Sequence, residues 1–439
     1  MYIRNEDNMK TDVLIVGCGC SGLYLALNLP RDKKILMITK SDAQSSDSFL
    51  AQGGMCMLKD ESDYDSYFED TMKAGHYEND KKSVEIMIRS SADVVKDLIA
   101  AGADFKKDEN GNLAYTREGA HSSNRIIFHE DVTSHLLERV RELPNVTLLE
   151  NTRMLDIITK DNECLGAVIR LESGLIENVI ADATVLAAGG IGGLYRHSTN
   201  FRHLTGDAVA VAIKHNVAIK DINYVQIHPT TFYSKDEKDR SFLISESVRG
   251  EGAKLYDKDG NRFVNELLPR DLLTQAIYKQ MKKDGTDHVW EDLRTIPEDE
   301  LKTHFPNIVQ YCYEHGYDVT KECIPVVPAQ HYFMGGIKVD YESKTSMDRL
   351  YAVGETACNG VHGRNRLASN SLLESLVFAK RAAHNMAENE LIDILAPSAD
   401  EYVENADKSQ YQDEEKLDEY YGELIRQKID EADEAIKTA

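Results

Sequence analysis

The sequence lacks the features of a membrane protein and of a disulfide-bonded or zinc-binding protein. Its 439 residues include no apolar run of about 18 residues, so we expect no membrane-spanning helix. The opening segment MYIRNEDNMK has no apolar signal region, which favours a cytoplasmic location. The 7 cysteines are scattered and form no C-x-x-C pair, so we expect reduced structural thiols and no metal site.

Basic residues are also scarce. Lys and Arg number 51 against 75 Asp and Glu, which gives a net charge of −24. This balance disfavours nucleic acids and anionic membrane surfaces as partners, because both need basic patches. An anionic substrate would need local positive charge that opposes the repulsive field of the whole chain. The length favours two domains with additional segments, and a hydrophobic content of 42% suffices for substantial cores.

A glycine-rich motif near the start predicts a dinucleotide site. Asp12–Val16 is typical of a buried parallel strand, and a helical pattern, LYLALNL, begins at Leu23. Between them, G-x-G-x-x-G allows a tight turn and close approach of a pyrophosphate, although a plain packing turn is the alternative. The next strand, Lys34–Thr39, leads into Lys40 and not into the acid that binds a ribose, which argues against a generic NAD site. The motif consists of Gly17, Cys18, Gly19, Cys20, Ser21 and Gly22.

A second ligand signal lies in Tyr351–Glu374. The pattern predicts a short strand over Leu350–Val353, then a loop rich in Gly and Asn, then a helix from Asn370. A helix N-terminus presents unpaired N–H groups, and Arg364 and Arg366 add cations that can grip a carboxylate. A solvated loop whose arginines face water explains this segment equally well.

The order of elements predicts an α/β fold, with a Rossmann-like domain interrupted by an insertion. We place the Rossmann-like domain at residues 10–221 and 334–388, and an α+β capping domain at 222–333. Charge-dense residues 389–439 predict a helical tail, either solvated or docked weakly or paired with a partner. Within the first domain we expect helix over Tyr64–Leu98 and separate strands at Leu175–Ala181 and Asp182–Ala188.

Motifs spread over residues 11–388 resemble those of one family. The chain is similar to the L-aspartate oxidases, within the succinate dehydrogenase and fumarate reductase flavoprotein superfamily. The motifs occur in the family's order, and their combination is specific although each alone is not. They are GCGCSG, SFLAQGG, TREGAHS, AAGG, TGDA, QIHPT, SESVRGEGA, PRD, PAQHYFMGG, YAVGE and HGRNRLASNSLLES.

The resemblance implies FAD as the cofactor, because the family has a Lys where Lys40 stands. Ser371 and Leu372 would present helix N–H groups to the flavin pyrimidine edge, where they stabilise negative charge on the reduced ring. Relatives with covalent FAD carry a His at the position of Asp47, so we expect non-covalent binding. By motif, the other cofactor contacts are the glycine loop, Ser48, Phe49, Leu50, Ala51, Gln52, Gly53, Gly54, Asp207 and Glu355.

A dicarboxylate substrate needs two clusters of cations or hydrogen-bond donors. His228 can hold one carboxylate, and His331 with Arg366 can hold the other, although an isolated His is more often structural. The family pattern favours binding roles for these three residues and retains a useful hydroxyl at Ser245. By the same pattern, Arg364 is peripheral.

The resemblance also implies which residues act on the substrate. Arg270 matches the superfamily's proton-transferring arginine; because a guanidinium holds its proton strongly, this role needs neighbours and a dry site. Glu246 would orient Arg270 or the flavin side. Glu118 matches an acid particular to aspartate oxidases, which would select aspartate over succinate by pairing with the ammonium group. Its alternative is a cap within its own loop, and His121 is a weaker candidate.

The resemblance implies oxidation of L-aspartate to iminoaspartate, the first step of quinolinate and NAD synthesis. Oxygen or fumarate would accept the electrons, and quinolinate synthase is a partner that the product's instability suggests. A soluble fumarate reductase is the alternative enzyme. A non-catalytic flavin-binding protein whose tail docks a partner is the alternative of a different class. The family usually continues after the NSLLE helix with a longer helical bundle than this chain has.

Overall fold

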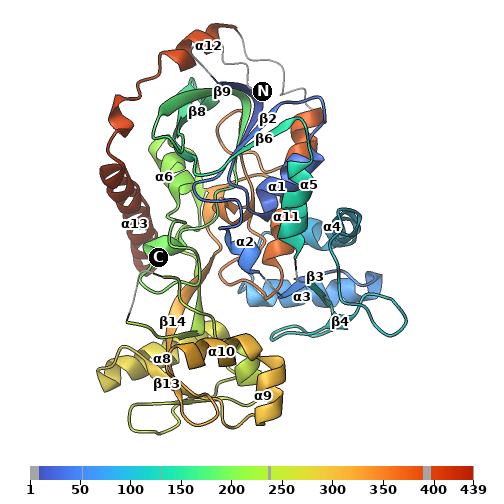
Figure 1. Cartoon of the computed structure of the whole chain (residues 1–439), viewed down its shortest axis with the longest axis vertical. Helices are drawn as coiled ribbons and strands as arrows, with labels where there is room; N and C mark the ends of the chain where they lie inside the picture. The colour runs from blue at the N-terminus through green and yellow to red at the C-terminus, as the bar shows by residue number, and fades with distance from the viewer. Residues whose placement is uncertain (1–8, 52, 130, 236–238, 389–396, 439) are drawn as a thin grey trace. The chain divides into compact units, whose positions relative to one another are not determined.

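The computed structural model describes residues 9–51, 53–129, 131–235, 239–388 and 397–438. The chain forms two compact units (Figure 1). The first unit contains residues 1–191, 203–224 and 333–439, and the second contains residues 192–202 and 225–332. The predicted capping insertion spans 222–333, whereas the second unit spans Val225–Tyr332 and also takes in Gly192–Arg202.

The first unit is built on a largely parallel sheet. Its strand order is β6-β2-β1-β9-β8-β7, and β16 pairs with β9. The second half of β1, Val13–Val16, and all of β2 are apolar and buried, as parallel strands covered on both faces must be. The strands are β1 (Met9–Val16), β2 (Ile35–Ile38), β6 (Val146–Leu149), β7 (Arg153–Lys160), β8 (Glu163–Arg170), β9 (Ile176–Leu186) and β16 (Leu350–Ala352).

Helices pack against this sheet and against each other. Helix α1 contacts α11 and α5, and α11 also contacts α4. Together they bury an apolar cluster that includes Leu23, Leu25, Val95 and Leu376. The helices of the first unit are α1 (Cys20–Asn28), α2 (Asp47–Leu50), α3 (Tyr64–Ala74), α4 (Lys81–Ala100), α5 (Val132–Arg141), α6 (Asp207–Lys214), α11 (Ser371–Glu388), α12 (Pro397–Glu404) and α13 (Glu414–Thr438).

Two small sheets complete the first unit. One has the order β3-β5-β4 and the other β10-β15-β17. Their strands are β3 (Gly53–Cys56), β4 (Tyr115–Thr116), β5 (Ile126–His129), β10 (Ile219–Lys220), β15 (Gly336–Lys338) and β17 (Ala357–Cys358). The short 3-10 helices of this unit are η1 (Glu61–Asp63), η3 (Gly354–Thr356) and η4 (Ser409–Tyr411), while η2 (Gly192–Leu194) belongs to the second unit.

The second unit has a four-stranded antiparallel sheet in the order β11-β14-β13-β12, with helices packed on it. Its own apolar cluster includes Leu255, Leu273, Ile277 and Val326. The elements are β11 (Val225–Phe232), β12 (Lys254–Tyr256), β13 (Val289–Asp292), β14 (Ile324–Phe333), α7 (Glu246–Gly250), α8 (Arg270–Asp284), α9 (Glu298–His304) and α10 (Pro306–Glu314).

Two expectations about the first unit were wrong in detail. The expected helix over Tyr64–Leu98 is two helices, because His76 and Tyr77 adopt left-handed backbone angles and Asp80 starts α4 by capping the N–H of Ser83. The two strands expected between Leu175 and Ala188 form one continuous strand, β9.

The described part of the tail docks on the first unit. Helix α13 runs along α6 (Figure 1). It buries Leu417, Tyr421 and Ile425, and the Tyr421 hydroxyl donates a hydrogen bond of 2.5 Å to the carbonyl of Leu155. An amphipathic stripe on an otherwise charged helix therefore faces the chain itself.

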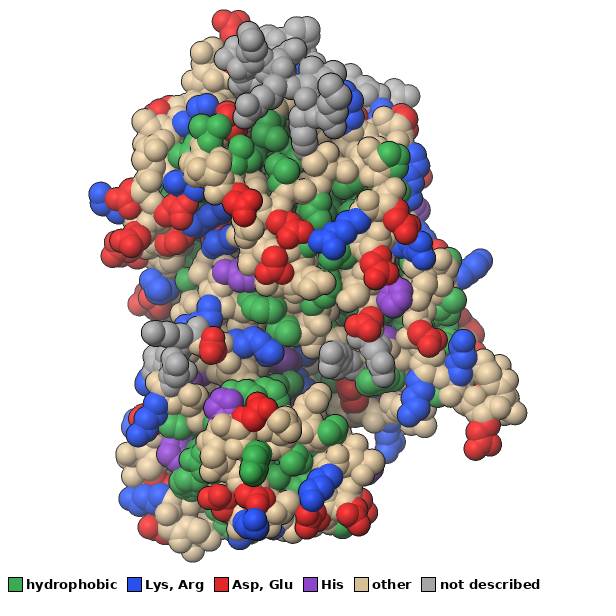
Figure 2. All heavy atoms as spheres, in the orientation of Figure 1, with side chains coloured by type: hydrophobic (Ala, Val, Ile, Leu, Met, Phe, Trp, Pro, Cys, Tyr) green, Lys and Arg blue, Asp and Glu red, His purple; other side chains and the backbone are tan. Residues whose placement is uncertain are grey.

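Among the described residues, no helix is both long and apolar enough to cross a membrane. Acidic and basic side chains intermingle over the face drawn in Figure 2.

Candidate active site

Loops after four strands of the main sheet leave from one edge. Val16 pairs with Ile38 and with Leu186, and Leu186 pairs with Ala352, so these parallel strands end side by side. Ligands of open α/β sheets bind at this carboxyl edge. The sequence motifs GCGCSG, AAGG and YAVGE all follow these strand ends.

The glycine loop closes too tightly for side chains. Gly17 has a φ of +113°, and a Cβ there would lie 2.1 Å from the carbonyl oxygen of Ala187. A Cβ at Gly22 would lie 2.3 Å from the carbonyl oxygen of Gly17. Helix α1 begins directly after Gly19 with no acidic residue in its first turn and no side-chain cap, which favours an anionic group at its N-terminus.

Lys40 and Asp207 belong to one partly buried charge cluster in the first unit. Lys40 Nζ lies 3.0 Å from Asp207 Oδ2, and Arg153 Nε donates to the same carboxylate at 2.9 Å. Burial alone would raise the pKa of Asp207, but the two cations lower it below its usual range. Arg153 also pairs with Asp418 of α13.

Glu355 and Asp47 bring acidic groups to the same sheet edge. Glu355 accepts a hydrogen bond of 2.8 Å from the N–H of Phe333, and a Cβ at Gly190 would lie 2.5 Å from its Oε1. Burial, followed by the nearby Asp47 carboxylate, raises the pKa of Glu355 to about 8. Of the other predicted cofactor contacts, Ser48 lies in α2 (Asp47–Leu50), and its Oγ accepts a hydrogen bond of 3.0 Å from the Cys20 N–H. Ala51 follows α2, and Gly53 and Gly54 begin β3. Gln52 lies outside the described residues.

The arginines before α11 have different surroundings. Arg366 is only 9% exposed and donates a hydrogen bond of 3.1 Å to Ser371 Oγ at the start of α11. The Arg364 side chain is 51% exposed, 3.7 Å from Glu78 and over the ring of Tyr224. Arg366 is therefore held at the helix N-terminus, while Arg364 lies at the surface.

These residues fit a dinucleotide with a flavin. The glycine cradle and the α1 N-terminus suit a pyrophosphate, while the α11 N-terminus with Ser371 and Leu372 offers N–H groups. The cysteines of the loop are unsuited to nucleophilic chemistry, because burial raises the pKa of the Cys20 thiol to about 12. All 7 cysteines are free thiols.

Two histidines and an arginine gather in the second unit. The His228 and His331 rings lie 5.5 Å apart between centroids, and His331 Nδ1 lies 2.8 Å from Thr199 Oγ1. Burial lowers the pKa of His228 well below its usual value, and Arg270, His331 and Arg249 lower it further. Such a neutral imidazole surrounded by positive potential suits a carboxylate.

Arg270 is the first residue of α8, where it is held by two acceptors. Its Nε donates to Glu246 Oε2 at 2.7 Å and its Nη1 donates to Gln226 Oε1 at 3.1 Å. Ser245 precedes α7 and caps it by accepting the Ser247 N–H at 3.3 Å. Glu246 thus contacts Arg270, the first of the two partners that the sequence left open for it.

Arg249 is a residue of this cluster that sequence reasoning missed. It is 2% exposed and donates from Nη1 to the carbonyl of Glu266 at 2.8 Å. Among the described residues, its Nε and Nη2 have no hydrogen-bond partner. The sequence did contain a signal for it. Arg249 follows Glu246 by three positions on the short helix α7, so both residues lie on the same helix face.

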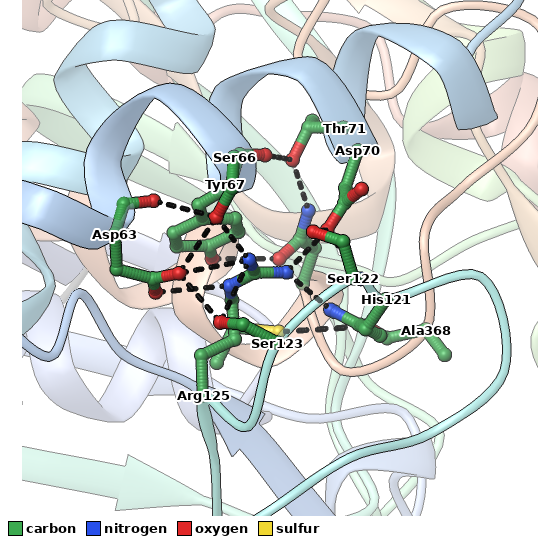
Figure 3. A network of polar contacts seen from close by, with 12 residues as sticks. Asp63, Ser66, Tyr67, Asp70, Thr71, His121, Ser122, Ser123, Arg125 and Ala368 are labelled. Carbon is green, nitrogen blue, oxygen red and sulfur yellow. Dashed lines mark hydrogen bonds and ion pairs between the residues drawn. The ribbon is translucent and has the colours of Figure 1, made fainter.

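The loop that carries Glu118 meets the segment before α11. Glu118 Oε2 accepts a hydrogen bond of 2.8 Å from Ser369 Oγ, and His121 Nε2 lies 3.0 Å from the carbonyl of Ala368. Figure 3 shows His121 and Arg125 within a dense polar network. Glu118, His121 and Arg366 are therefore brought to one region of the first unit.

A cavity of about 770 Å³ lies elsewhere in the first unit, lined by residues of β7, α6 and α12. The Asp156 carboxylate in its wall is paired with Lys214, His215 and Tyr411. None of the predicted site residues lines it.

The chain matches the family model described as FAD binding domain over residues 12–372. It therefore belongs to this family of FAD-binding proteins. L-Aspartate oxidase of Clostridium perfringens is 51% identical over 377 residues, covering 85% of each chain. That of Clostridium acetobutylicum is 49% identical, covering 86% of this chain and 88% of its own. Within the family, the chain thus belongs with the L-aspartate oxidases.

Solved structures show the same fold. A quinol fumarate reductase of E. coli superposes with a TM-score of 0.79 at 27% identity, covering 96% of this chain and 74% of that one. Sdh1 of Mycobacterium smegmatis superposes with a TM-score of 0.79 at 29% identity, covering 90% of this chain and 72% of that one. The expected α/β flavoprotein fold and the expected FAD cofactor are both confirmed.

Proposed function

We propose that this protein oxidises L-aspartate to iminoaspartate, with FAD bound non-covalently, and so begins quinolinate and NAD synthesis in the cytoplasm. Membership of the L-aspartate oxidases supports the reaction. The observation that carries the proposal is the placing of two arginines, the buried Arg249 and the partly buried Arg270, near the neutral, buried His228 in a chain of net charge −24. Concentrated buried positive charge in an acidic protein suits a small dianion.

Oxidation of the amine removes two electrons and two hydrogens from L-aspartate. FAD, when bound, accepts the electron pair with one hydrogen. The other hydrogen leaves as a proton, and we assign Arg270 to take or relay it. The bond from Arg270 Nε to Glu246 at 2.7 Å supports this role, because it orients the guanidinium and connects it to a second proton-carrying group.

The remaining residues bind and orient the substrate. His228 and Ser245 would hold one carboxylate and His331 with Arg366 the other, with Thr199 fixing the orientation of the His331 ring. Arg366 would bind a carboxylate through its planar guanidinium. Glu118 would accept hydrogen bonds from the ammonium group of the substrate. Correct placement before reaction is the main source of rate acceleration for such a step.

Fumarate reduction is the second candidate function. It is favoured by the structural likeness to a quinol fumarate reductase, and its substrate shares both carboxylates with aspartate. The two substrates differ in the amino group, which only L-aspartate carries, so Glu118→Gln discriminates between the two functions. For an aspartate oxidase, the variant should lose aspartate turnover far more than fumarate turnover; equal losses would count against the assigned role of Glu118.

Anaerobic mixing with substrate tests the proposal directly. L-Aspartate should bleach the visible absorption band of the flavin, and succinate should bleach it much more slowly. Readmission of oxygen, or addition of fumarate, should restore the band and so identify the electron acceptor. A flavin band that stays unchanged with L-aspartate would contradict the oxidase function.

A further inference from the structure

We propose that His121 is a positioning residue for substrate selection, which ties the loop carrying Glu118 to the segment carrying Arg366. The proposal rests on the function proposed above. It concerns contacts within the first unit only. His121 is buried, whereas Glu118 is exposed at the other end of the same turn.

Two contacts determine which nitrogen of the ring carries the proton. Arg125 Nη1 lies 3.1 Å from His121 Nδ1, and His121 Nε2 lies 3.0 Å from the carbonyl oxygen of Ala368. A guanidinium only donates, so Nδ1 accepts from Arg125, and Nε2 carries the hydrogen and donates to Ala368. Both nitrogens are thus committed to the protein, and His121 has none left for proton transfer with a substrate.

Arg125 is a fixed anchor for this ring. Its side chain is fully buried and bonds both oxygens of Asp63, at 3.1 and 2.9 Å, and Asp70 at 2.6 Å (Figure 3). A bidentate pair inside the protein defines the position of both partners. The network therefore fixes His121 relative to η1 and α3.

The segment that His121 contacts through Ala368 is also held in place by hydrogen bonds. Asn370 accepts from the Tyr67 hydroxyl at 2.7 Å and donates to Thr71 Oγ1 at 3.2 Å, and the carbonyl of Ser369 accepts from the Cys56 N–H at 3.0 Å. Ala368, Ser369 and Asn370 connect Arg366 to α11. With Glu118 bonded to Ser369, an acceptor for an ammonium group and a donor for a carboxylate are held at a set separation. That pair of groups distinguishes an amino dicarboxylate from a plain one.

The contacts of His121 with Arg125 and Ala368 require the neutral form of its imidazole. Protonation would place a hydrogen on Nδ1, facing the donor Nη1 of Arg125, and would break that bond. Burial, and then Arg125, lower the pKa of His121, while Glu118, Asp70 and the bond to Ala368 act in the opposite direction. Two further groups lie near this region, and neither favours protonation of His121. Burial keeps Cys56 a neutral thiol, and Arg366 is a cation.

A double-mutant cycle tests the proposal. His121→Asn keeps an acceptor for Arg125 but loses the donor to Ala368. It should lower kcat/KM for L-aspartate about tenfold, mainly through KM, while fumarate reduction falls much less. In a Glu118→Gln background the same change should have little further effect on the aspartate-to-fumarate ratio, because His121 acts through Glu118.

Ser66→Ala is the matched control, because Ser66 accepts from Arg125 Nη2 at 2.8 Å without touching His121. It should lower the melting temperature and leave the substrate ratio unchanged. Equal losses for both substrates in His121→Asn, or losses that add to those of Glu118→Gln, would overturn the proposal. Failure of the unaltered protein to react with L-aspartate would instead contradict the proposed function.

Discussion

Buried charges are the groups on which single substitutions should act most strongly. Arg366 lies in a buried position against Ser371, while Arg364, two residues before it, is half exposed and meets Glu78. The same side-chain chemistry thus has two very different environments within one loop. A guanidinium removed from water contributes far more to binding an anion than one at the surface.

Arg366→Leu should abolish L-aspartate turnover while FAD remains bound, because the change removes a carboxylate donor from a site otherwise intact. Arg364→Ala should leave most of the activity. Steady-state turnover and the visible spectrum of each purified variant are the measurements. A fully active Arg366→Leu variant, or an inactive Arg364→Ala variant, would reverse the assignment.

Glu291 in β13 is a buried acid that the proposed reaction does not use. Both of its carboxylate oxygens lack a hydrogen-bond partner among the described residues. Burial raises its pKa to about 8, against the lowering effect of Arg249. The protonated form is therefore the one that the folded chain favours.

Since the pKa of Glu291 is higher in the folded than in the unfolded chain, its contribution to stability is complete below the unfolded value. It is lost as the pH rises towards about 8. The melting temperature should therefore fall less between pH 5 and pH 8 for Glu291→Gln than for the unaltered protein. Glu109→Gln, at an exposed position, is the control and should follow the unaltered protein. Parallel curves for Glu291→Gln would show that Glu291 does not titrate in this range.

At the scale of elements, turns and helix ends set where side chains point. The Glu118–His121 turn closes with a bond of 3.3 Å from the His121 N–H to the Glu118 carbonyl, and Ala120 at its third position has a φ of +67°. Glycine is the usual residue there, because a Cβ crowds the backbone in the left-handed region. The turn is thus held in shape by its contacts at both ends.

Ala120→Gly should stabilise the protein by about 0.5–1 kcal/mol, because the left-handed backbone then carries no side-chain strain. Thermal melting should show a rise of about 1–2 °C. Ala100→Gly, near the end of α4, is the opposite control and should lower the melting temperature, because glycine weakens a helix. A fall for Ala120→Gly as well would show that the turn is not strained.

Elements were predictable to the extent that their patterns are local. The strand–glycine–helix unit at β1 and α1, and the start of α11, are where the sequence placed them. The break between α3 and α4 was missed although local signals mark it: Gly75 is the C-cap of α3 and Asp80 is the N-cap of α4. Between them, His76 and Tyr77 adopt left-handed angles, which are uncommon for such residues and could not be predicted.

At the scale of the whole chain, the tail is linked to predicted cofactor residues. Asp418 on α13 pairs with Arg153, which bonds Asp207, which in turn pairs with Lys40. Gly206 lies beneath the same helix, since a Cβ there would be 2.8 Å from Ile425 Cδ1. The docked tail thereby supports the turn that presents Asp207.

Asp418→Asn should weaken FAD binding by about threefold, a modest change because the Asp418 side chain is 50% exposed and its ion pair is partly screened. Glu419→Gln, an equal charge change at an exposed position of the same helix, should leave the affinity unchanged. Titration of the FAD-free protein with FAD, followed by flavin fluorescence, measures both. Equal affinities for both variants would separate the tail from the cofactor site.

The sequence by itself determined the class of fold, the cofactor and the family, because glycine turns and short charged motifs carry their chemistry within a few neighbouring residues. Only the tertiary structure decided which polar and charged groups are buried or paired: Arg249 beside His228, Asp418 on Arg153, and the neutral ring of His121 between Arg125 and Ala368. The physical reason is that burial and pairing depend on residues far apart in the chain, and these alone decide how strongly a charge acts.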